Sequence, residues 1–331
     1  MYTAVVIGAG RIGAMFDTPD SERILTHAHA YAAHEGYVLK GFYDVNLDRA
    51  KEAAERWQVQ AFSSLEEALE GVDVVSCTVP DAYHGEMLKK IAQFPVKAVF
   101  AEKPLVTDLQ EGEEIKQLYA EKKIALLVNY TRRFVPEFLK LKKEIQTFGS
   151  FRRGCGYYGK GILHNGSHMI DLLRYYIGEV SDFTVGDGME DFYKTDPSVE
   201  VTLYMQTKDG LGKFDMHPIS CQEVSVFEID FYFEKGRIRM FDCGSKLEIY
   251  EIEASEVYQG YQYYTKIDEC DTTYDAAFFV ALDHIKEVIQ NNLTPICSVE
   301  DGIEVLRICK AIQEQYQKQS CSLPETREEK M

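Results

Sequence analysis

The sequence has no Cys-x-x-Cys pair, no long apolar run and comparatively few basic residues. Eight cysteines are scattered over 331 residues. This indicates neither a zinc site nor a redox dithiol, so we expect reduced thiols and no bound metal. No segment approaches the roughly 18 apolar residues of a membrane-spanning helix, and the first residues lack the features of a signal peptide. We therefore expect a soluble cytoplasmic protein.

The charge balance is strongly acidic. The chain has 36 Lys and Arg residues against 54 Asp and Glu residues, a formal net charge of −18. Such a surface repels phosphate backbones and anionic lipid head groups, so nucleic-acid binding and membrane-surface binding are disfavoured. Hydrophobic residues make up 45% of the chain, which is enough to bury the two cores that a chain of this length usually forms.

The first 130 residues alternate short apolar runs with longer helical patterns. This order is typical of βαβ units, in which right-handed crossovers place helices on both faces of a parallel sheet. We expect strands at Tyr2–Ile7, Tyr37–Tyr43, Val72–Thr78, Ala98–Ala101 and Ala125–Asn129. Helices are expected between them at Leu47–Trp57, Leu65–Glu70, Tyr83–Gln93 and Asp108–Lys122. The sequence predicts an α/β domain over residues 1–130, a doubly wound Rossmann sheet.

The pattern changes after about Pro136. Predicted helices at Pro136–Thr147 and Ser167–Ile177 precede a β-rich stretch in which polar and apolar residues alternate, as in Glu228–Phe233. Short turns between such strands make an antiparallel sheet. Two further helices, Tyr274–Asn291 and Val299–Gln317, close the region. We predict an α+β domain with a large, mostly antiparallel open sheet over residues 131–318, and a disordered tail at 319–331.

A glycine-rich motif directly follows the first predicted strand. Gly8-Ala9-Gly10-Arg11-Ile12-Gly13 is a complete G-x-G-x-x-G. The first glycine permits a tight turn, the second lets the backbone approach a pyrophosphate, and the third allows helix and strand to pack closely. Because a helix amino terminus faces the phosphates, Gly8, Gly10, Arg11, Ile12 and Gly13 are predicted to bind a dinucleotide.

An aspartate ends the second predicted strand. A carboxylate at Asp44 accepts hydrogen bonds from ribose hydroxyls and repels a 2′-phosphate, so we expect NAD as the cofactor. Arg49, on the next helix, keeps NADP open as an alternative. Asp44 lies farther from the glycines than the usual spacing of about 20 residues. Asp17–Thr26 is therefore expected to form an additional loop.

An ionisable pair follows the fourth predicted strand, in Glu102-Lys103-Pro104. The carboxyl ends of parallel strands are where open α/β sheets bind ligands. Pro104 restricts Lys103 to extended conformations, which would hold the lysine rigidly over the crevice. Taken alone, these three residues are equally compatible with a solvated lysine beside a turn.

These motifs belong to a longer ordered series. Thr78-Val79-Pro80-Asp81 and His84 come before Glu102-Lys103-Pro104, and Asn129–Pro136 (Asn-Tyr-Thr-Arg-Arg-Phe-Val-Pro) comes after it. Gly161–Asp171 then supplies Gly-x-His-x-x-Asp. With this series the chain resembles the Gfo/Idh/MocA family of NAD(P)-dependent oxidoreductases, by motif to about residue 178 and by the order of elements to about residue 318.

The resemblance implies hydride transfer between nicotinamide C4 and a secondary alcohol carbon, commonly of a sugar, an inositol or a sugar derivative. Lys103 would donate to the substrate oxygen, and His168 would accept or return the hydroxyl proton. Many members have an aspartate four residues before this histidine, where this chain has His164. A neutral imidazole supplies no negative charge to its neighbours. His164 is kept as a third catalytic candidate, with packing as the alternative interpretation.

The same motifs supply the remaining candidates. The predicted cofactor-binding set also includes Thr78, Val79, Pro80, His84 and Glu102. A polyhydroxylated substrate is bound by paired hydrogen-bond donors such as guanidinium groups, by amides and by aromatic faces. The candidates are Arg132, Arg133, Tyr157, Tyr158, Asn165 and Asp171. Asp171 equally fits a helix-dipole role without contact to substrate. A wide sheet with one open face needs a covering surface, so we expect a homodimer or homotetramer through that face.

Three alternatives to an NAD-dependent dehydrogenase stay open. An NAD-dependent glycosidase-type enzyme would recycle its cofactor and form product without net NADH. A biliverdin-reductase-like reductase would use the same architecture on a non-sugar substrate. A non-catalytic NAD-binding sensor would lack turnover, but the presence of both Lys103 and His168 disfavours it.

Overall fold

The computed structural model describes residues 1–220 and 222–322. The chain folds into two compact units, the first made of Met1–Lys140 and Thr273–Leu306, the second of Leu141–Thr272 and Arg307–Met331. The first unit thus includes a later segment that the sequence-based division at residue 130 assigned to the second domain. The reason is a contact between residues far apart in sequence: the N–H of Val128 donates to the carbonyl of Cys297 at 3.1 Å.

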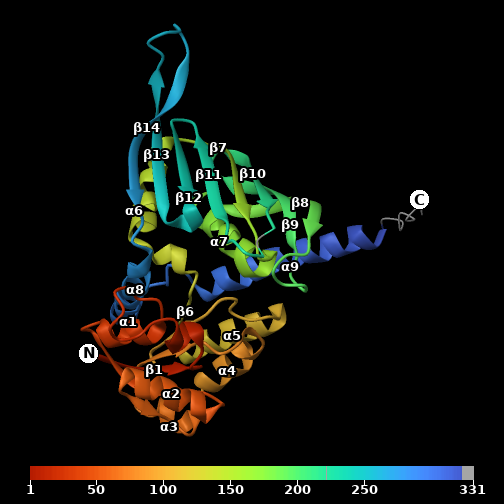
Figure 1. Cartoon of the computed structure of the whole chain (residues 1–331). Helices are drawn as coiled ribbons and strands as arrows, with labels where there is room; N and C mark the ends of the chain where they lie inside the picture. Colours follow the sequence, from red (N-terminus) through yellow and green to blue (C-terminus); the bar gives the residue numbers. More distant parts are fainter. Residues whose placement is uncertain (221, 323–331) are drawn as a thin grey trace. The chain divides into compact units, whose positions relative to one another are not determined.

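The first unit is built on a six-stranded parallel sheet (Figure 1). Its strand order is β3-β2-β1-β4-β5-β6, as predicted for a Rossmann domain. The strands are β1 (Tyr2–Ile7), β2 (Tyr37–Tyr43), β3 (Gln60–Ala61), β4 (Val74–Cys77), β5 (Ala98–Ala101) and β6 (Ala125–Val128). The helices are α1 (His27–Ala33), α2 (Leu47–Trp57), α3 (Leu65–Leu69), α4 (His84–Ile91), α5 (Leu109–Lys122) and α8 (Ala277–Asn291).

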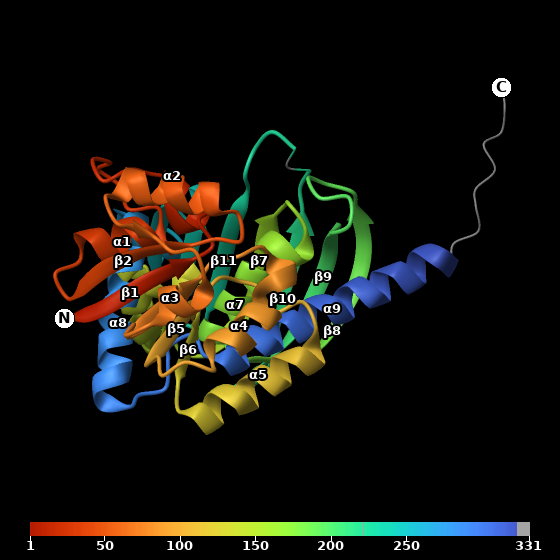
Figure 2. The same ribbon diagram turned by 90° about the horizontal axis from the view of Figure 1, so that it is seen from below.

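Local sequence explains where these helices begin. Asn46 caps α2 by accepting hydrogen bonds from two backbone N–H groups of its first turn, and Asp108 caps α5 by accepting from one, the N–H of Glu111. Helix α1, which the sequence analysis did not predict, starts after Thr26, whose hydroxyl accepts from the N–H of His29. Helix α1 packs with α8 and α4 packs with α5 (Figure 2). The central strands β4 and β5 are buried along their whole length between such layers.

The second unit is built on an eight-stranded sheet of order β14-β13-β12-β11-β7-β10-β9-β8. Every pair is antiparallel except β10 with β7, which confirms the predicted mostly antiparallel sheet. The strands are β7 (Phe151–Tyr158), β8 (Glu179–Met189), β9 (Ser198–Thr207), β10 (Gly210–Pro218), β11 (Phe227–Phe233), β12 (Gly236–Phe241), β13 (Lys246–Ala254) and β14 (Gln262–Asp271).

Alternation along the strands gives this sheet a buried face and an open face. On β11, Phe227, Ile229, Phe231 and Phe233 are buried, and the residues between them are half-buried. Helix α7 (Ser167–Tyr176) covers the buried side, where its Met169 lies against β7. The other face carries ion pairs, including Arg237 with Asp230.

Two helices carry the chain from one unit into the other. They are α6 (Pro136–Glu144) and α9 (Val299–Ser322). Helix α9 includes residues 319–322, the first four residues of the predicted disordered tail. The rest of that tail, 323–331, lies outside the described residues.

Candidate functional site

The glycine-rich loop lies at the carboxyl end of β1. The sheet order places β2 on one side of β1 and β4 on the other, so the loop is at the point where the order reverses, the usual ligand site of such sheets. Gly8 has φ +102°, and a Cβ there would lie 2.6 Å from the backbone of Thr78. Only glycine fits this close approach of the loops that follow β1 and β4.

Thr78 holds these two loops together. Its hydroxyl donates to the carbonyl of Gly8 at 2.7 Å, and it lies 2.7 Å from where a side chain on Gly13 would begin. By contrast, a Cβ on Gly10 would meet no atom within 4 Å. The second glycine therefore borders open space, which fits the approach of a pyrophosphate to the backbone. Arg11 and Ile12 follow in a single π-helical turn, Arg11–Met15.

Asp44 is tied to the same loop. Its Oδ2 accepts a hydrogen bond from the N–H of Ala9 at 2.9 Å, and its Oδ1 accepts from the N–H of Asn46 at 2.8 Å. The carboxylate is half-buried. Because each carboxylate oxygen can accept more than one hydrogen bond, both retain capacity for a ribose hydroxyl.

The additional loop expected before α1 is present and is built around Asp17. This buried carboxylate accepts hydrogen bonds from the N–H of Leu25 and the hydroxyl of Thr26, and it contacts Nδ1 of His29 at 2.9 Å. The loop therefore has a fixed polar centre, and it delivers the chain to the start of α1.

His84 connects the loops that follow β4 and β5. Its ring nitrogens lie 2.8 Å from the carbonyl of Val79 and 2.6 Å from the carbonyl of Pro104. The side chain is fully buried. This placement assigns His84 to the support of the two loops, including the predicted cofactor-binding segment Thr78, Val79 and Pro80.

Glu102 is the centre of a polar network at the carboxyl end of β5. His27 Nε2 lies 3.0 Å from its Oε1, and the amide of Asn129 donates to the same oxygen at 2.7 Å. The other ring nitrogen of His27 lies 2.8 Å from the hydroxyl of Ser76. Lys103 follows at once, and its backbone N–H donates to Oε2 of Glu102 at 3.3 Å.

This network keeps Glu102 ionised. Burial is the largest influence and acts to raise the pKa of the carboxyl, but hydrogen bonds from His27 and Asn129 and the charge of Lys103 outweigh it, so the pKa lies below its usual range. The ionised group stabilises the fold above the ordinary glutamate pKa, and this contribution is lost as the pH falls through the lowered value. A negative charge is thereby fixed next to Lys103.

In the second unit, His164 and His168 lie on continuous helical backbone. His164 is in a π-helical turn, Ile162–Gly166, that leads directly into α7, of which His168 is the second residue. Residues four apart on a helix share one face, so the two imidazoles do as well. Between them, Asn165 donates to the carbonyl of Val226 at 3.1 Å. Asp171 is buried and is the fifth residue of α7, beyond the first turn in which a helix-dipole role was expected.

A buried carboxylate holds His164. Nδ1 of His164 lies 2.8 Å from Oδ2 of Asp196, and its ring stacks on Tyr193 at a centroid distance of 3.7 Å. From the sequence we expected no negative charge at position 164, where this chain has a histidine. Asp196 supplies one from a segment 32 residues further along the chain.

Tyr157 and Tyr158 do not share one side of the sheet. Neighbouring residues of a strand point to opposite faces. Tyr158 is fully buried, and its hydroxyl donates to the carbonyl of Val199 at 2.6 Å and accepts from the N–H of Val199. Tyr157 is 42% exposed and its ring contacts His217. The two tyrosines therefore lie on opposite faces of the sheet, and only Tyr157 is exposed.

The two predicted substrate arginines are both buried in the first unit. Arg133 donates to the carbonyl of Ile296 at 2.7 Å and forms an ion pair with Asp301 at 3.1 Å. It thereby ties the later segment Thr273–Leu306 to the body of its unit. The guanidinium of Arg132 lies 5.7 Å from the ring of Tyr274. These contacts give Arg133 a structural role within the first unit.

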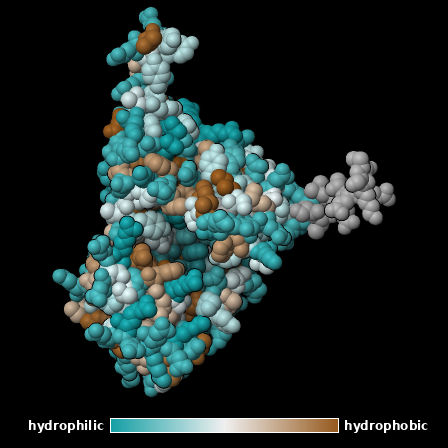
Figure 3. Space-filling model, viewed as in Figure 1, coloured by the Kyte–Doolittle hydropathy of each residue, from teal (hydrophilic) through white to brown (hydrophobic). Residues whose placement is uncertain are grey.

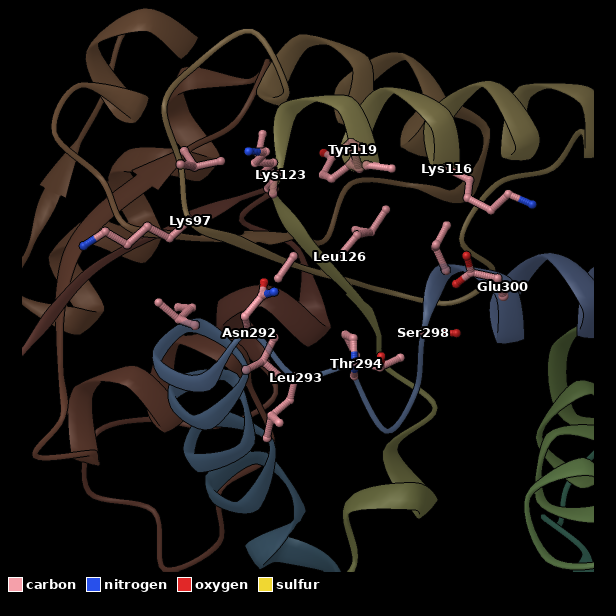
Figure 4. A pocket seen from close by; sticks show the side chains of 18 residues that line it. Lys97, Lys116, Tyr119, Lys123, Leu126, Asn292, Leu293, Thr294, Ser298 and Glu300 are labelled. Carbon is pink, nitrogen blue, oxygen red and sulfur yellow. The ribbon is translucent and has the colours of Figure 1, made fainter.

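A cavity of about 800 Å³ in the first unit lies away from these residues (Figure 4). It is lined by the amino ends of β5 and β6 together with parts of α5, α8 and α9, including Lys97, Lys123, Leu126 and Asn292. The glycine-rich loop and Lys103 lie at the opposite, carboxyl ends of the strands. The cavity is therefore separate from the predicted cofactor site.

Residues 1–220 and 222–322 also bear on metal binding and on membrane insertion. Within these ranges no group of three or more His, Cys, Asp or Glu side chains is arranged to hold a metal ion. In the same part of the chain, no helix combines the length and the apolar character needed to cross a membrane.

Family profiles match most of the chain. Residues 2–130 match an oxidoreductase family with an NAD-binding Rossmann fold, and residues 158–323 match the C-terminal α/β domain of the same family. The fold is similar to UDP-N-acetylglucosamine 3-dehydrogenase from Acidithiobacillus ferrooxidans, with TM-score 0.79, 20% identity and coverage of 96% of this chain and 98% of that one. It is also similar to an oxidoreductase from Agrobacterium radiobacter in complex with NAD+, L-tartaric acid and magnesium, with TM-score 0.74, 14% identity and coverage of 96% and 97%.

Sequence relatives include inositol dehydrogenases. The scyllo-inositol 2-dehydrogenase (NAD(+)) of Bacillus subtilis is 24% identical over 324 residues, 90% of this chain and 89% of the relative. The myo-inositol 2-dehydrogenase of Thermotoga maritima is 26% identical, with coverage of 70% and 73%. Other matches are shorter: the chain spans 40% of the length of the UDP-N-acetylglucosamine 3-dehydrogenase sequence, at 29% identity.

Proposed function

The chain belongs to the Gfo/Idh/MocA oxidoreductase family, and from this premise we propose that it is an NAD-dependent dehydrogenase of a polyhydroxylated secondary alcohol. One observation carries the proposal. A single edge of the first unit's sheet gathers the glycine-rich loop, Asp44 and the Glu102–Lys103 pair, all at carboxyl ends of parallel strands. This edge is where such sheets bind a dinucleotide and its substrate.

Lys103, His168 and Glu102 each have a separate role in the proposed alcohol oxidation. NAD supplies the acceptor for the hydride when it is bound. Lys103 donates to the substrate oxygen and stabilises the negative charge that develops on it, and His168 accepts the hydroxyl proton. Glu102, kept ionised by His27 and Asn129, places a negative charge next to Lys103. In the reverse direction, His168 returns the proton.

Because Gly10 borders open space, we expect a substitution there to weaken cofactor binding without lowering the stability of the fold. We expect Gly10→Ala to fold with unchanged or slightly raised stability, because φ is −81° and a Cβ there meets no atom. It should nevertheless weaken NAD binding, since the methyl group occupies the space proposed for the pyrophosphate. Thermal unfolding and NAD titration measure the two effects. Gly8→Ala is the contrasting variant and should lose about 1–3 kcal/mol of stability. Unchanged NAD affinity in Gly10→Ala would contradict the cofactor assignment.

Asp44 predicts a preference for NAD over NADP. Replacing it by asparagine removes the charge that repels a 2′-phosphate. We expect the difference in binding free energy between NAD and NADP to decrease by about 1–2 kcal/mol, as for a hydrogen bond to a charged group. Titrations with both cofactors test this. Asp48→Ala is a matched control, because this carboxylate lies in the first turn of α2 and is 95% exposed. Tighter binding of NADP than of NAD to the unaltered protein would refute the role of Asp44.

The proposed substrate class is a sugar, an inositol or a sugar derivative. It rests on the relatives, which are named for inositols and for a nucleotide sugar, and on the polar residues near His168, among them Asn165. A screen of inositols, sugars and nucleotide sugars for NADH formation tests it. Product formed without net NADH would favour the glycosidase-type alternative. NAD binding without turnover of any compound would favour the sensor.

We also propose that a second copy of the chain covers the open face of the second unit's sheet. This face carries Arg239, which pairs with Glu248 at 2.9 Å. The β13–β14 hairpin exposes Val257, Tyr258 and Tyr261 at its far end. Figure 3 shows one small brown group there among mostly hydrophilic colours. Exposed aromatic residues of this kind are typical of interfaces. A monomeric mass by light scattering would contradict the proposal.

A further inference from the structure

The aspartate behind His164 fixes the chemical form of its imidazole. Asp196 is 2% exposed, and its Oδ2 lies 2.8 Å from Nδ1 of His164. A carboxylate only accepts hydrogen bonds, so Nδ1 carries the hydrogen, and Nε2 of the neutral ring keeps its lone pair. We propose that Asp196 is a positioning residue that selects this tautomer and so makes Nε2 of His164 a proton acceptor.

The turn that carries His164 is built around the Asp196 carboxylate. The backbone N–H groups of Leu163 and His164 each donate to it at 3.0 Å, and the amide of Gln313 donates to Oδ1 at 2.9 Å. Gly161 has φ +87°, and a Cβ on it would lie 2.0 Å from Oδ2. The carboxylate is therefore held in place by groups other than the imidazole, and a fixed acceptor can in turn orient the ring.

A second contact fixes the plane of the ring. Tyr193 stacks on His164 with an interplanar angle of 13°. The His164 side chain is still 35% exposed, so the stacked ring is not enclosed. One edge of the imidazole is thus anchored to Asp196, and its flat face is anchored to Tyr193. This arrangement, an acid that orients an imidazole and sets its tautomer, is the one by which hydrolytic triads prepare a histidine base.

The role of the Asp196–His164 dyad in the reaction depends on the proposed function. Oxidation of an alcohol releases one hydride, which reduces NAD, and one proton, which an imidazole accepts. The neutral His164 ring together with ionised Asp196 carries a charge of minus one, the charge that the family's aspartate would supply. His164 shares a helix face with His168. The dyad therefore provides a second imidazole on this face, with Nε2 as the nitrogen that can accept a proton.

Nuclear magnetic resonance of the full chain tests the dyad without a substrate. Ring nitrogen–proton correlation spectra of 15N-labelled protein, with the signals assigned through His164→Gln, should show His164 protonated at Nδ1. In Asp196→Asn the hydrogen of His164 should no longer be confined to Nδ1, because the asparagine amide can donate to that nitrogen as well as accept from it.

Gln313→Ala is the matched control, because it removes a hydrogen bond to the same carboxylate but leaves its charge. Its His164 ring should stay protonated at Nδ1. Asp196→Asn should also lower kcat about 10- to 100-fold with little change in KM. A wild-type ring protonated at Nε2, or the same tautomer preference in wild type and Asp196→Asn, would overturn the dyad. If both spectroscopic results appear but no alcohol reduces NAD, the dyad stands and the proposed function fails.

Discussion

Lys103→Ala should lose turnover by a factor of about 100 to 1,000 while its affinity for NAD changes no more than a few-fold. The lysine follows β5, at the carboxyl edge of the sheet, and Glu102 beside it is held ionised by a buried network. Its proposed partner is the substrate oxygen, whose charge develops only in the transition state. Removing it therefore affects kcat far more than cofactor binding.

Steady-state kinetics and NAD titration of the same preparation measure these two effects. Lys116→Ala is the control, because this lysine lies on α5 and pairs with Glu113 at the surface. It should have wild-type activity and NAD affinity. Near-normal turnover in Lys103→Ala would refute the assignment of Lys103 to the reaction, and equal losses in both variants would indicate a general effect of removing a lysine.

His168→Ala should lower kcat/KM for alcohol oxidation by about 100- to 10,000-fold, the usual range for a general base. The base must be unprotonated to accept the hydroxyl proton, so activity of the wild type should fall as the pH drops through the titration of this imidazole. In the variant, the pH profile of the residual activity should lack this fall, the acidic limb of the wild-type profile. A pH profile of kcat/KM for both proteins measures the change.

His217→Ala provides the comparison for His168→Ala. His217 is a half-exposed histidine on β10, where its ring contacts Tyr157. This variant should keep both the rate and the acidic limb of the wild type. Substantial activity in His168→Ala, or the same acidic limb in its profile, would show that another group takes the proton.

The Rossmann domain could be predicted from sequence because each of its strands and most of its helices are indicated by a pattern within a short segment. The bounds of β1, β2, β5 and α2 match the predicted ranges, since buried parallel strands are short apolar runs and a polar cap such as Asn46 marks the start of a helix. Helix α1 was missed because an additional loop separates it from the glycine motif. His27, which α1 brings to Glu102, was missed with it.

The missing parts of the site depend on contacts between residues far apart in sequence. Asp196 reaches His164 across 32 residues and belongs to no local motif. Asn129 was quoted within a motif, but its partner Glu102 lies 27 residues earlier. Tyr157 and Tyr158 are adjacent in sequence, but the strand period of two places them on opposite faces of the sheet.

Isotope transfer from substrate to cofactor tests the central claim most directly. An inositol or sugar that reduces NAD would be prepared with deuterium on its carbinol carbon and oxidised by the wild-type protein. We predict that each molecule of ketone is accompanied by one molecule of NADH that carries one deuterium at nicotinamide C4, as measured by mass spectrometry. Unlabelled NADH, or ketone formed without an equal amount of NADH, would contradict direct hydride transfer from the alcohol to the nicotinamide.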